Sequence, residues 1–309
     1  MKTLIATALF IASSSALASP SETEVTLATT TGALTGSLIK ADNDQGTVAL
    51  IIAGSGPTDR NGNNAQMQNN SLQLLAEGLA TQGISSLRYD KRGVAASLDA
   101  GPSETDLRFS TYVDDAVLWL DYLRQQQHFK KLVIIGHSEG SLVGILAAQQ
   151  TPVSKLVSIA GVGDSAAKII RVQLEAQPEV VKQQASPILA KLEQGETVAE
   201  VPTMLNALFR PSVQPYLISW FQYDPAKEIA KLQLPLLVLQ GSHDIQVDVQ
   251  QATLLADANP RAQKVIIDGM NHILKLAPQD RQANIQTYNN PELPLADKVV
   301  STISEFIKK

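Results

Sequence analysis

The feature that most constrains this chain is a serine between glycines, Gly136-His137-Ser138-Glu139-Gly140, placed between predicted elements of different type. The apolar run 131–135 predicts a buried strand, and residues 141–150 predict a helix. A serine on such a strand–turn–helix stands on a sharp, strained backbone, and closely packed main chains leave room only for glycine on either side. This pattern predicts that the Ser138 hydroxyl projects above a sheet edge as a nucleophile.

Short apolar runs alternate with amphipathic stretches along most of the sequence. The predicted strands are 25–27, 36–39, 47–53, 84–89, 131–136, 155–160, 234–240 and 263–267. The later runs are continuous in Val, Ile and Leu, which is typical of strands buried on both faces of a parallel sheet. We therefore predict an α/β fold with a mostly parallel central sheet flanked by helices. The first two strands should form an antiparallel hairpin at one edge.

Residues 162–231 interrupt this alternation. They are helix-prone, rich in Gln, Ala, Val and Glu, and punctuated by prolines, which predicts a helical cap inserted into a core of residues 19–161 and 232–309.

One helix that precedes this segment has a recognisable N-terminal sequence pattern. Thr111 precedes an apolar stripe and is followed by Asp114, a capping-box pattern that predicts a helix opening at Thr111.

Residues 1–18 have the three parts of a secretory signal peptide. Lys2 gives the positive start, 4–12 is a short apolar run, and Ala16-Leu17-Ala18 is a small-x-small cleavage pattern. The apolar run is shorter than the roughly 20 residues that a membrane-spanning helix needs. We therefore expect export, to a bacterial periplasm or to the medium, without a membrane anchor.

The composition excludes several classes of protein. The chain has no cysteine, which rules out disulfides, thiolate metal sites and a cysteine nucleophile. Its formal net charge is −5 and no basic stripe stands out, so we expect no nucleic-acid partner. Neither a Gly-x-Gly-x-x-Gly turn nor a Gly-Lys-Ser/Thr phosphate loop is present, and we expect no cofactor and no metal. A monomer or a weak homo-oligomer is expected.

A serine hydroxyl becomes an effective nucleophile when a neighbouring imidazole accepts its proton. Of the four histidines, His272 follows the last predicted strand, in a loop that can reach the carboxyl end of the sheet. His137 lies inside the turn, with its side chain expected to point away from the serine. His128 is expected at the surface, and His243 adjoins a carboxylate in a loop. We predict that His272 is the base.

The acid that orients this imidazole should follow an earlier strand at the same edge of the sheet. Asp244 stands where the chain leaves the strand 234–240, so we predict that its carboxylate fixes the tautomer of His272. Asp248, a short way along the chain, is the alternative, whereas Asp268 lies too near the strand that precedes the histidine.

Attack on a carbonyl places negative charge on its oxygen, which needs two aimed hydrogen-bond donors. One predicted donor is the backbone N–H of Glu139, next to the nucleophile. The second is predicted in the loop after the strand 47–53, where Ser55 stands between glycines and Gly56 is the next choice. An ordinary turn or a phosphate-binding loop is the alternative for this segment.

With these residues placed, the chain resembles the α/β-hydrolase superfamily over essentially its whole mature length. More narrowly, it is similar to the bacterial exported serine-aminopeptidase-like or esterase-like branch. The segments that carry the resemblance read IIAGSGPTDRNG at 51–62, RYDKRG at 88–93, GHSEG at 136–140, GSHD at 241–244 and NH at 271–272. The resemblance implies this fold, and it implies the roles of nucleophile, acid and base for Ser138, Asp244 and His272 and of oxyanion donors for Ser55 and Glu139.

These residues together predict a serine hydrolase that cleaves a carboxylic ester through an acyl-enzyme. An aminopeptidase or amidase of the serine-aminopeptidase type is the first alternative. It would need carboxylates in the cap to hold a substrate ammonium, and those available there are Glu175, Glu179, Glu193, Glu196 and Glu200. A thioesterase is disfavoured by the expected export, and a non-catalytic binding protein is the remaining alternative. The expected partner is a small ester or peptide-like substrate; the substrate-binding residues are unknown from the sequence.

Overall fold

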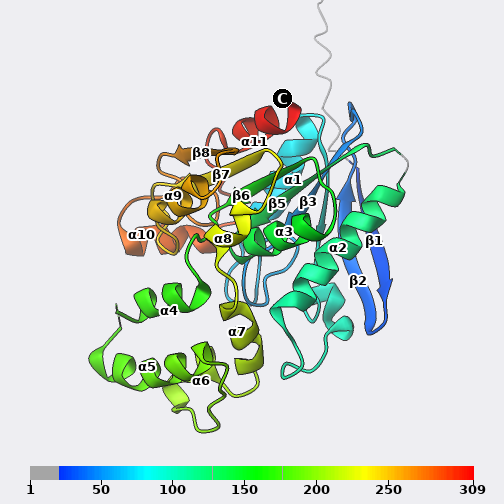
Figure 1. Cartoon of the computed structure of the whole chain (residues 1–309). Coiled ribbons are helices and arrows are strands. Elements are labelled where there is room, and N and C mark those ends of the chain that lie inside the picture. Colours follow the sequence, from blue (N-terminus) through cyan, green and yellow to red (C-terminus); the bar gives the residue numbers. More distant parts are fainter. Residues whose placement is uncertain (1–20, 127, 176) are drawn as a thin grey trace, which may run out of the picture.

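A computed structural model describes residues 21–126, 128–175 and 177–309 (Figure 1). The expected signal peptide, residues 1–18, lies outside the described residues and stays a prediction. The strands are β1 (Glu22–Thr29), β2 (Gly32–Ile39), β3 (Thr47–Ile52), β4 (Ser85–Tyr89), β5 (Lys131–His137), β6 (Lys155–Ile159), β7 (Leu236–Gly241) and β8 (Ala262–Ile267).

These strands form one twisted sheet in the order β1-β2-β4-β3-β5-β6-β7-β8. β1 pairs antiparallel with β2, and β2 pairs antiparallel with β4. Every pairing from β4 through β8 is parallel. The predicted α/β fold is therefore confirmed, and so is the antiparallel hairpin at one edge.

The helices lie on both faces of the sheet and in one long insertion. They are α1 (Ser71–Thr81), α2 (Phe109–Gln125), α3 (Glu139–Gln150), α4 (Ala166–Glu175), α5 (Glu179–Glu193), α6 (Asn206–Phe209), α7 (Gln214–Phe221), α8 (Pro225–Ala230), α9 (Val249–Asp257), α10 (Arg281–Gln286) and α11 (Val299–Lys308). Within the described residues, no helix combines the length and apolar character needed to cross a bilayer.

Alternate residues of β3 face two separate apolar cores, as the period of a strand requires. Leu50 is fully buried in the core that contains Trp119 of α2. Its neighbour Ile51 is buried in the core that contains Leu75 of α1 and Ile303 of α11. The sheet is thus covered on both faces, which explains the continuous apolar runs of its central strands.

The segment between β6 and β7 is helical and carries α4 to α8. Figure 1 shows α4, α5, α6 and α7 gathered at the lower left, apart from the strands of the sheet. That this segment is a separate cap with the boundaries 162–231 stays a prediction.

The start of α2 differs from the one expected from the sequence. The helix begins at Phe109, not at Thr111, and the Thr111 side chain does not cap it. The backbone N–H of Phe109 instead donates to the Ser219 hydroxyl of α7, at 2.8 Å. The first backbone N–H of α2 therefore has its hydrogen-bond acceptor in a side chain distant in sequence. The local pattern had predicted that Thr111 would cap this helix.

The turn from β5 into α3 is tightly packed. Ser138 has φ 55° and ψ −122°, a conformation that L-residues rarely adopt. A Cβ at Gly136 would lie 2.6 Å from the Cα of Ser141, and a Cβ at Gly140 would lie 2.6 Å from the carbonyl oxygen of Ala53. Both glycines are thus required where α3 crosses the sheet, as the motif predicts.

We expect Gly140→Ala to lower the free energy of unfolding by about 3 kcal/mol, because the added methyl group overpacks against the β3 backbone. Gly195→Ala is the matched control. Gly195 has φ +81° and open space around its Cα, so only the left-handed backbone opposes the methyl group, at a cost of about 1 kcal/mol. Urea unfolding of both variants measures the difference; equal stability of Gly140→Ala and wild type would contradict the packing argument.

Candidate active site

The three residues predicted to act together come from three different strands. Ser138 follows β5, Asp244 follows β7 and His272 follows β8. Because these strands are parallel, their carboxyl ends meet at one edge of the sheet. The loops after them bring the three side chains into contact.

The contact is a chain of two hydrogen bonds with the imidazole in the middle. His272 Nδ1 lies 2.7 Å from Asp244 Oδ2, and His272 Nε2 lies 3.1 Å from Ser138 Oγ. Since a carboxylate only accepts, Nδ1 carries the proton and Nε2 carries a lone pair that faces the hydroxyl. The imidazole is therefore placed to take the proton of Ser138.

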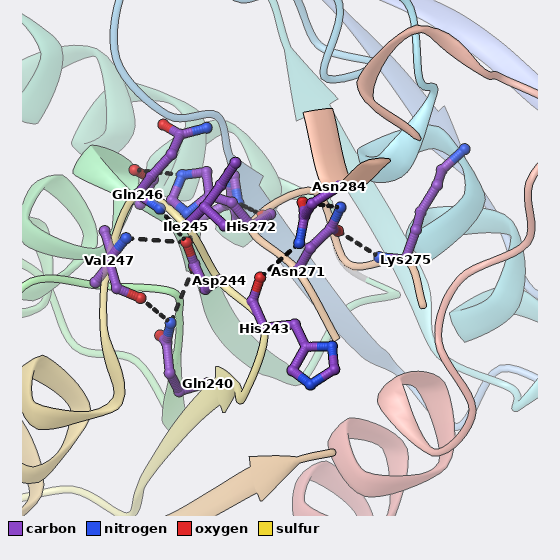
Figure 2. Close-up of polar contacts among 12 residues, drawn as sticks. Gln240, His243, Asp244, Ile245, Gln246, Val247, Asn271, His272, Lys275 and Asn284 are labelled. Atoms are coloured by element: carbon purple, nitrogen blue, oxygen red, sulfur yellow. Dashed lines mark hydrogen bonds and ion pairs between the residues drawn. The ribbon is translucent and has the colours of Figure 1, made fainter. Parts of the chain in front are cut away.

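Asp244 is surrounded by donors (Figure 2). Its Oδ1 accepts the backbone N–H groups of Gln246 and Val247 at 2.8 and 2.9 Å, and the Gln240 amide donates to Oδ2 at 2.9 Å. Burial is the largest influence and acts to raise the pKa of Asp244, but the His272 imidazole and these backbone donors outweigh it. The pKa of Asp244 is consequently lowered, and the carboxyl stays ionised. Sequence reasoning missed Gln240, which lies within β7.

An amide network supports the loop that carries His272 (Figure 2). Asn271 donates to the side-chain oxygen of Asn284 at 3.2 Å, and Asn284 donates to the carbonyl oxygen of His243 at 2.8 Å. The Asn271 side chain also accepts the backbone N–H of Lys275 at 3.1 Å, which closes the turn around His272. The network therefore connects the loop that carries Asp244 with the loop that carries His272.

His137 lies beside His272, a contact that the sequence does not predict. The ring centroids are 4.9 Å apart, and Nε2 of His137 lies 2.8 Å from the backbone oxygen of His272, where it donates its proton. Burial, with the nearby His272 ring as a second cause, lowers the pKa of His137 to about 4. His137 is thus a neutral group that holds the backbone of His272.

A cavity of about 210 Å³ opens at the serine, and the remaining predicted residues border it or lie beside it. Ser55 lines this cavity, in the loop after β3. Glu139 begins α3, so its backbone N–H belongs to the helix end that lacks partners within the helix. Its side chain is buried, accepts a hydrogen bond from Tyr216 Oη at 2.9 Å, and lies 3.8 Å from Lys91 Nζ. Neither Tyr216 nor Lys91 was selected from the sequence.

Apart from His137, the aspartates and histidines that were considered but not selected from the sequence interact with groups other than Ser138 and His272. Asp248 accepts the backbone N–H groups at the start of α9 and so caps that helix. Asp268 accepts from the Ser242 hydroxyl at 3.0 Å. His128 is exposed next to Asp44, and Nδ1 of His243 lies 2.7 Å from a backbone oxygen.

The cap glutamates available to hold an ammonium group do not line the cavity at Ser138. All five are exposed. Glu175 and Glu179 lie within ion-pair distance of Lys182, and Glu193 pairs with Arg171. Among the residues that the structure describes, no cluster of His, Asp or Glu has the arrangement of a metal site.

Comparison with known proteins adds relatives in sequence and in structure. Residues 66–211 match the family model described as serine aminopeptidase, S33. Esterase EstD of Thermotoga maritima is 24% identical over 238 residues, covering 73% of this chain and 54% of that protein. The chain thus spans about half the length of this curated relative.

Two solved structures share the fold over nearly the whole chain. Est1E of Butyrivibrio proteoclasticus superposes with a TM-score of 0.62 at 16% identity, covering 93% of this chain and 99% of that one. An esterase of Pyrococcus furiosus gives a TM-score of 0.60 at 17% identity, covering 94% and 91%. At these identities the likeness shows a common fold.

The lowered pKa of His137 predicts a pH-dependent stability. Its ordinary pKa of 6.5 falls to about 4 in the folded protein, so between these values the unfolded chain binds a proton that the folded one does not. The His137 contribution is present above pH 6.5 and is lost as the pH falls towards 4, by on the order of 3 kcal/mol. We expect His137→Gln to flatten the fall in unfolding free energy between pH 7 and pH 4. A fall as steep in His137→Gln as in the wild-type protein would contradict the assignment.

Proposed function

We propose that the chain is a member of the α/β-hydrolase superfamily that hydrolyses carboxylic esters of small acyl groups with Ser138 as nucleophile. The observation that carries the proposal is the continuous hydrogen-bonded chain from Asp244 through His272 to Ser138. Est1E of Butyrivibrio proteoclasticus and the Pyrococcus furiosus protein, both of this fold, are structurally similar to the chain, and the second is described as an esterase.

In the proposed reaction Ser138 Oγ attacks the ester carbonyl while His272 Nε2 takes its proton. Asp244 holds the imidazole in the required tautomer and stabilises the imidazolium that forms. His272 then passes the proton to the departing alcohol oxygen, which leaves an acyl group on Ser138. A water molecule, deprotonated by the same imidazole, attacks this acyl-enzyme and releases the acid.

Negative charge develops on the carbonyl oxygen in both steps. We assign its stabilisation to the backbone N–H groups of Glu139 and Ser55. The N-terminal end of α3 adds a partial positive charge at the same place.

The cavity at Ser138 favours a small, uncharged ester over a peptide with a free amino terminus. Its volume of about 210 Å³ is below the range of about 300–1,000 Å³ typical of sites for larger ligands. Polar lining comes from neutral groups such as Thr58, Asn64 and Gln246. No carboxylate among the described residues that line it is available to hold a substrate ammonium.

We expect a fluorophosphonate probe to label the wild-type protein and not Ser138→Ala, while Ser242→Ala keeps the labelling. p-Nitrophenyl acetate should be hydrolysed faster than the decanoate, because the longer chain exceeds the cavity. Aminoacyl p-nitroanilides should be poor substrates. Labelling that survives in Ser138→Ala would refute the assignment of the nucleophile, and preferred cleavage of the anilides would favour the aminopeptidase.

Asp244→Asn should lower kcat for p-nitrophenyl acetate by about 10³–10⁴-fold, because an amide can donate to Nδ1 and stabilise the wrong tautomer of His272. Asp248→Asn is the matched control. It makes the same change nearby, at a helix cap where asparagine serves as well as aspartate, so activity should be retained. If the two variants had the same kcat, Asp244 would not be the orienting acid.

A further inference from the structure

The proposed reaction makes no use of a buried ammonium group that contacts Gly54, the residue before the proposed donor Ser55. Lys91 stands just after β4 and is only 2% exposed. Its Nζ donates to the carbonyl oxygen of Gly54 at 2.5 Å, lies 3.8 Å from Glu139 Oε1 and lies 5.1 Å from the centre of the Tyr112 ring. Burying a charged lysine costs free energy unless partners compensate it, so these contacts need an explanation.

The contact with Gly54 acts on the peptide that supplies one of the proposed oxyanion donors. The Gly54 carbonyl and the Ser55 N–H belong to the same planar peptide group, and none of the described peptide bonds is cis. In a trans peptide these two groups point in opposite directions. An ammonium group that holds the carbonyl oxygen therefore also fixes the direction of the Ser55 N–H.

The position of Gly54 makes this orientation matter for the serine. A Cβ at Gly54 would lie 3.1 Å from the Cβ of Ser138, so this peptide packs directly against the nucleophile. Glycine leaves the peptide free to rotate, and both residues after it, Ser55 and Gly56, are exposed. Lys91 contacts this segment from the buried side.

The same ammonium faces the residue that supplies the other proposed donor. The Glu139 carboxylate lies between Lys91 and the Tyr216 hydroxyl of α7. Burial lowers the pKa of Lys91 and raises the pKa of Glu139, and each charge opposes the shift of the other. One buried pair thus connects both donor-bearing segments, which follow β3 and β5.

We propose that Lys91 is a positioning residue that aligns the oxyanion donors, by holding the Gly54–Ser55 peptide through its carbonyl oxygen and the Glu139 segment through its carboxylate. The inference rests on the proposed esterase function. Lys91 touches no reacting atom, and its effect reaches the transition state through the backbone N–H groups of Ser55 and Glu139.

The test compares Lys91→Met with Arg92→Met. Methionine keeps the unbranched stem and removes the donor. Arg92 is a matched buried cation, paired with Asp115, and its loss also leaves a buried carboxylate without its partner.

We expect Lys91→Met to lower kcat for p-nitrophenyl acetate by about 10–100-fold, with KM changed less than about threefold. The loss should be smaller than the roughly 10²–10³-fold fall in kcat that follows removal of a complete oxyanion donor. Inhibition by an alkylboronic acid, which forms a tetrahedral adduct on serine, should weaken by the same factor. Arg92→Met should lower the melting temperature and keep kcat within about threefold of wild type.

Two further variants keep the comparison decisive. Lys91→Arg retains a donor and should recover part of kcat. Lys91→Met/Glu139→Gln removes the unpaired carboxylate if the single variant does not fold, and it is compared with Glu139→Gln. A folded Lys91→Met enzyme with the same kcat as Arg92→Met would overturn the inference. If neither the single nor the double Lys91→Met variant folded, the inference would also be overturned, because Lys91 would then act on folding alone. A wild-type protein inert to the fluorophosphonate probe and to esters would instead remove the proposed function itself.

Discussion

The close approach of α3 to the sheet is the constraint on which the site depends. Gly140 presses against the carbonyl groups at the end of β3, and Gly136 presses against the first turn of α3. With the two backbones this near, Ser138 is held at positive φ with its hydroxyl towards His272. The strain at this residue is balanced by the surrounding packing, and the N-terminal end of α3 begins at the next residue.

The parts of the molecule that sequence reasoning predicts well are those encoded by short patterns. Each of the eight strand candidates falls within or overlaps a strand of the sheet, because a parallel sheet covered on both faces requires continuous apolar runs. The serine between two glycines predicts the sharp turn between β5 and α3. Ser138, Asp244 and His272 follow strands of one sheet, so their meeting follows from topology. Their catalytic roles stay part of the proposed function.

The side-chain contacts that the sequence does not predict are those between segments distant in sequence. The Gln240 amide reaches Asp244 only because β7 and the loop after it fold back on themselves. Lys91 lies within a polar run whose pattern does not reveal that Nζ meets the carbonyl of Gly54. The ring of His137, at the end of β5, packs on His272 in the loop after β8, and the sequence does not predict this contact. Local propensity contains no information about such partners.

The Ser219 hydroxyl that caps α2 has a consequence for how the molecule could be re-engineered. The helix is part of the layer that covers the sheet, yet the partner of its first N–H comes from the segment inserted after β6. Exchanging that insertion for one from another protein of this fold would leave Phe109 N–H without its acceptor unless the graft brought a hydroxyl to the same point. Exchange of this segment is thus restricted by the Ser219 hydroxyl as well as by apolar packing, and a shortened chain without the segment would need a new residue to cap α2.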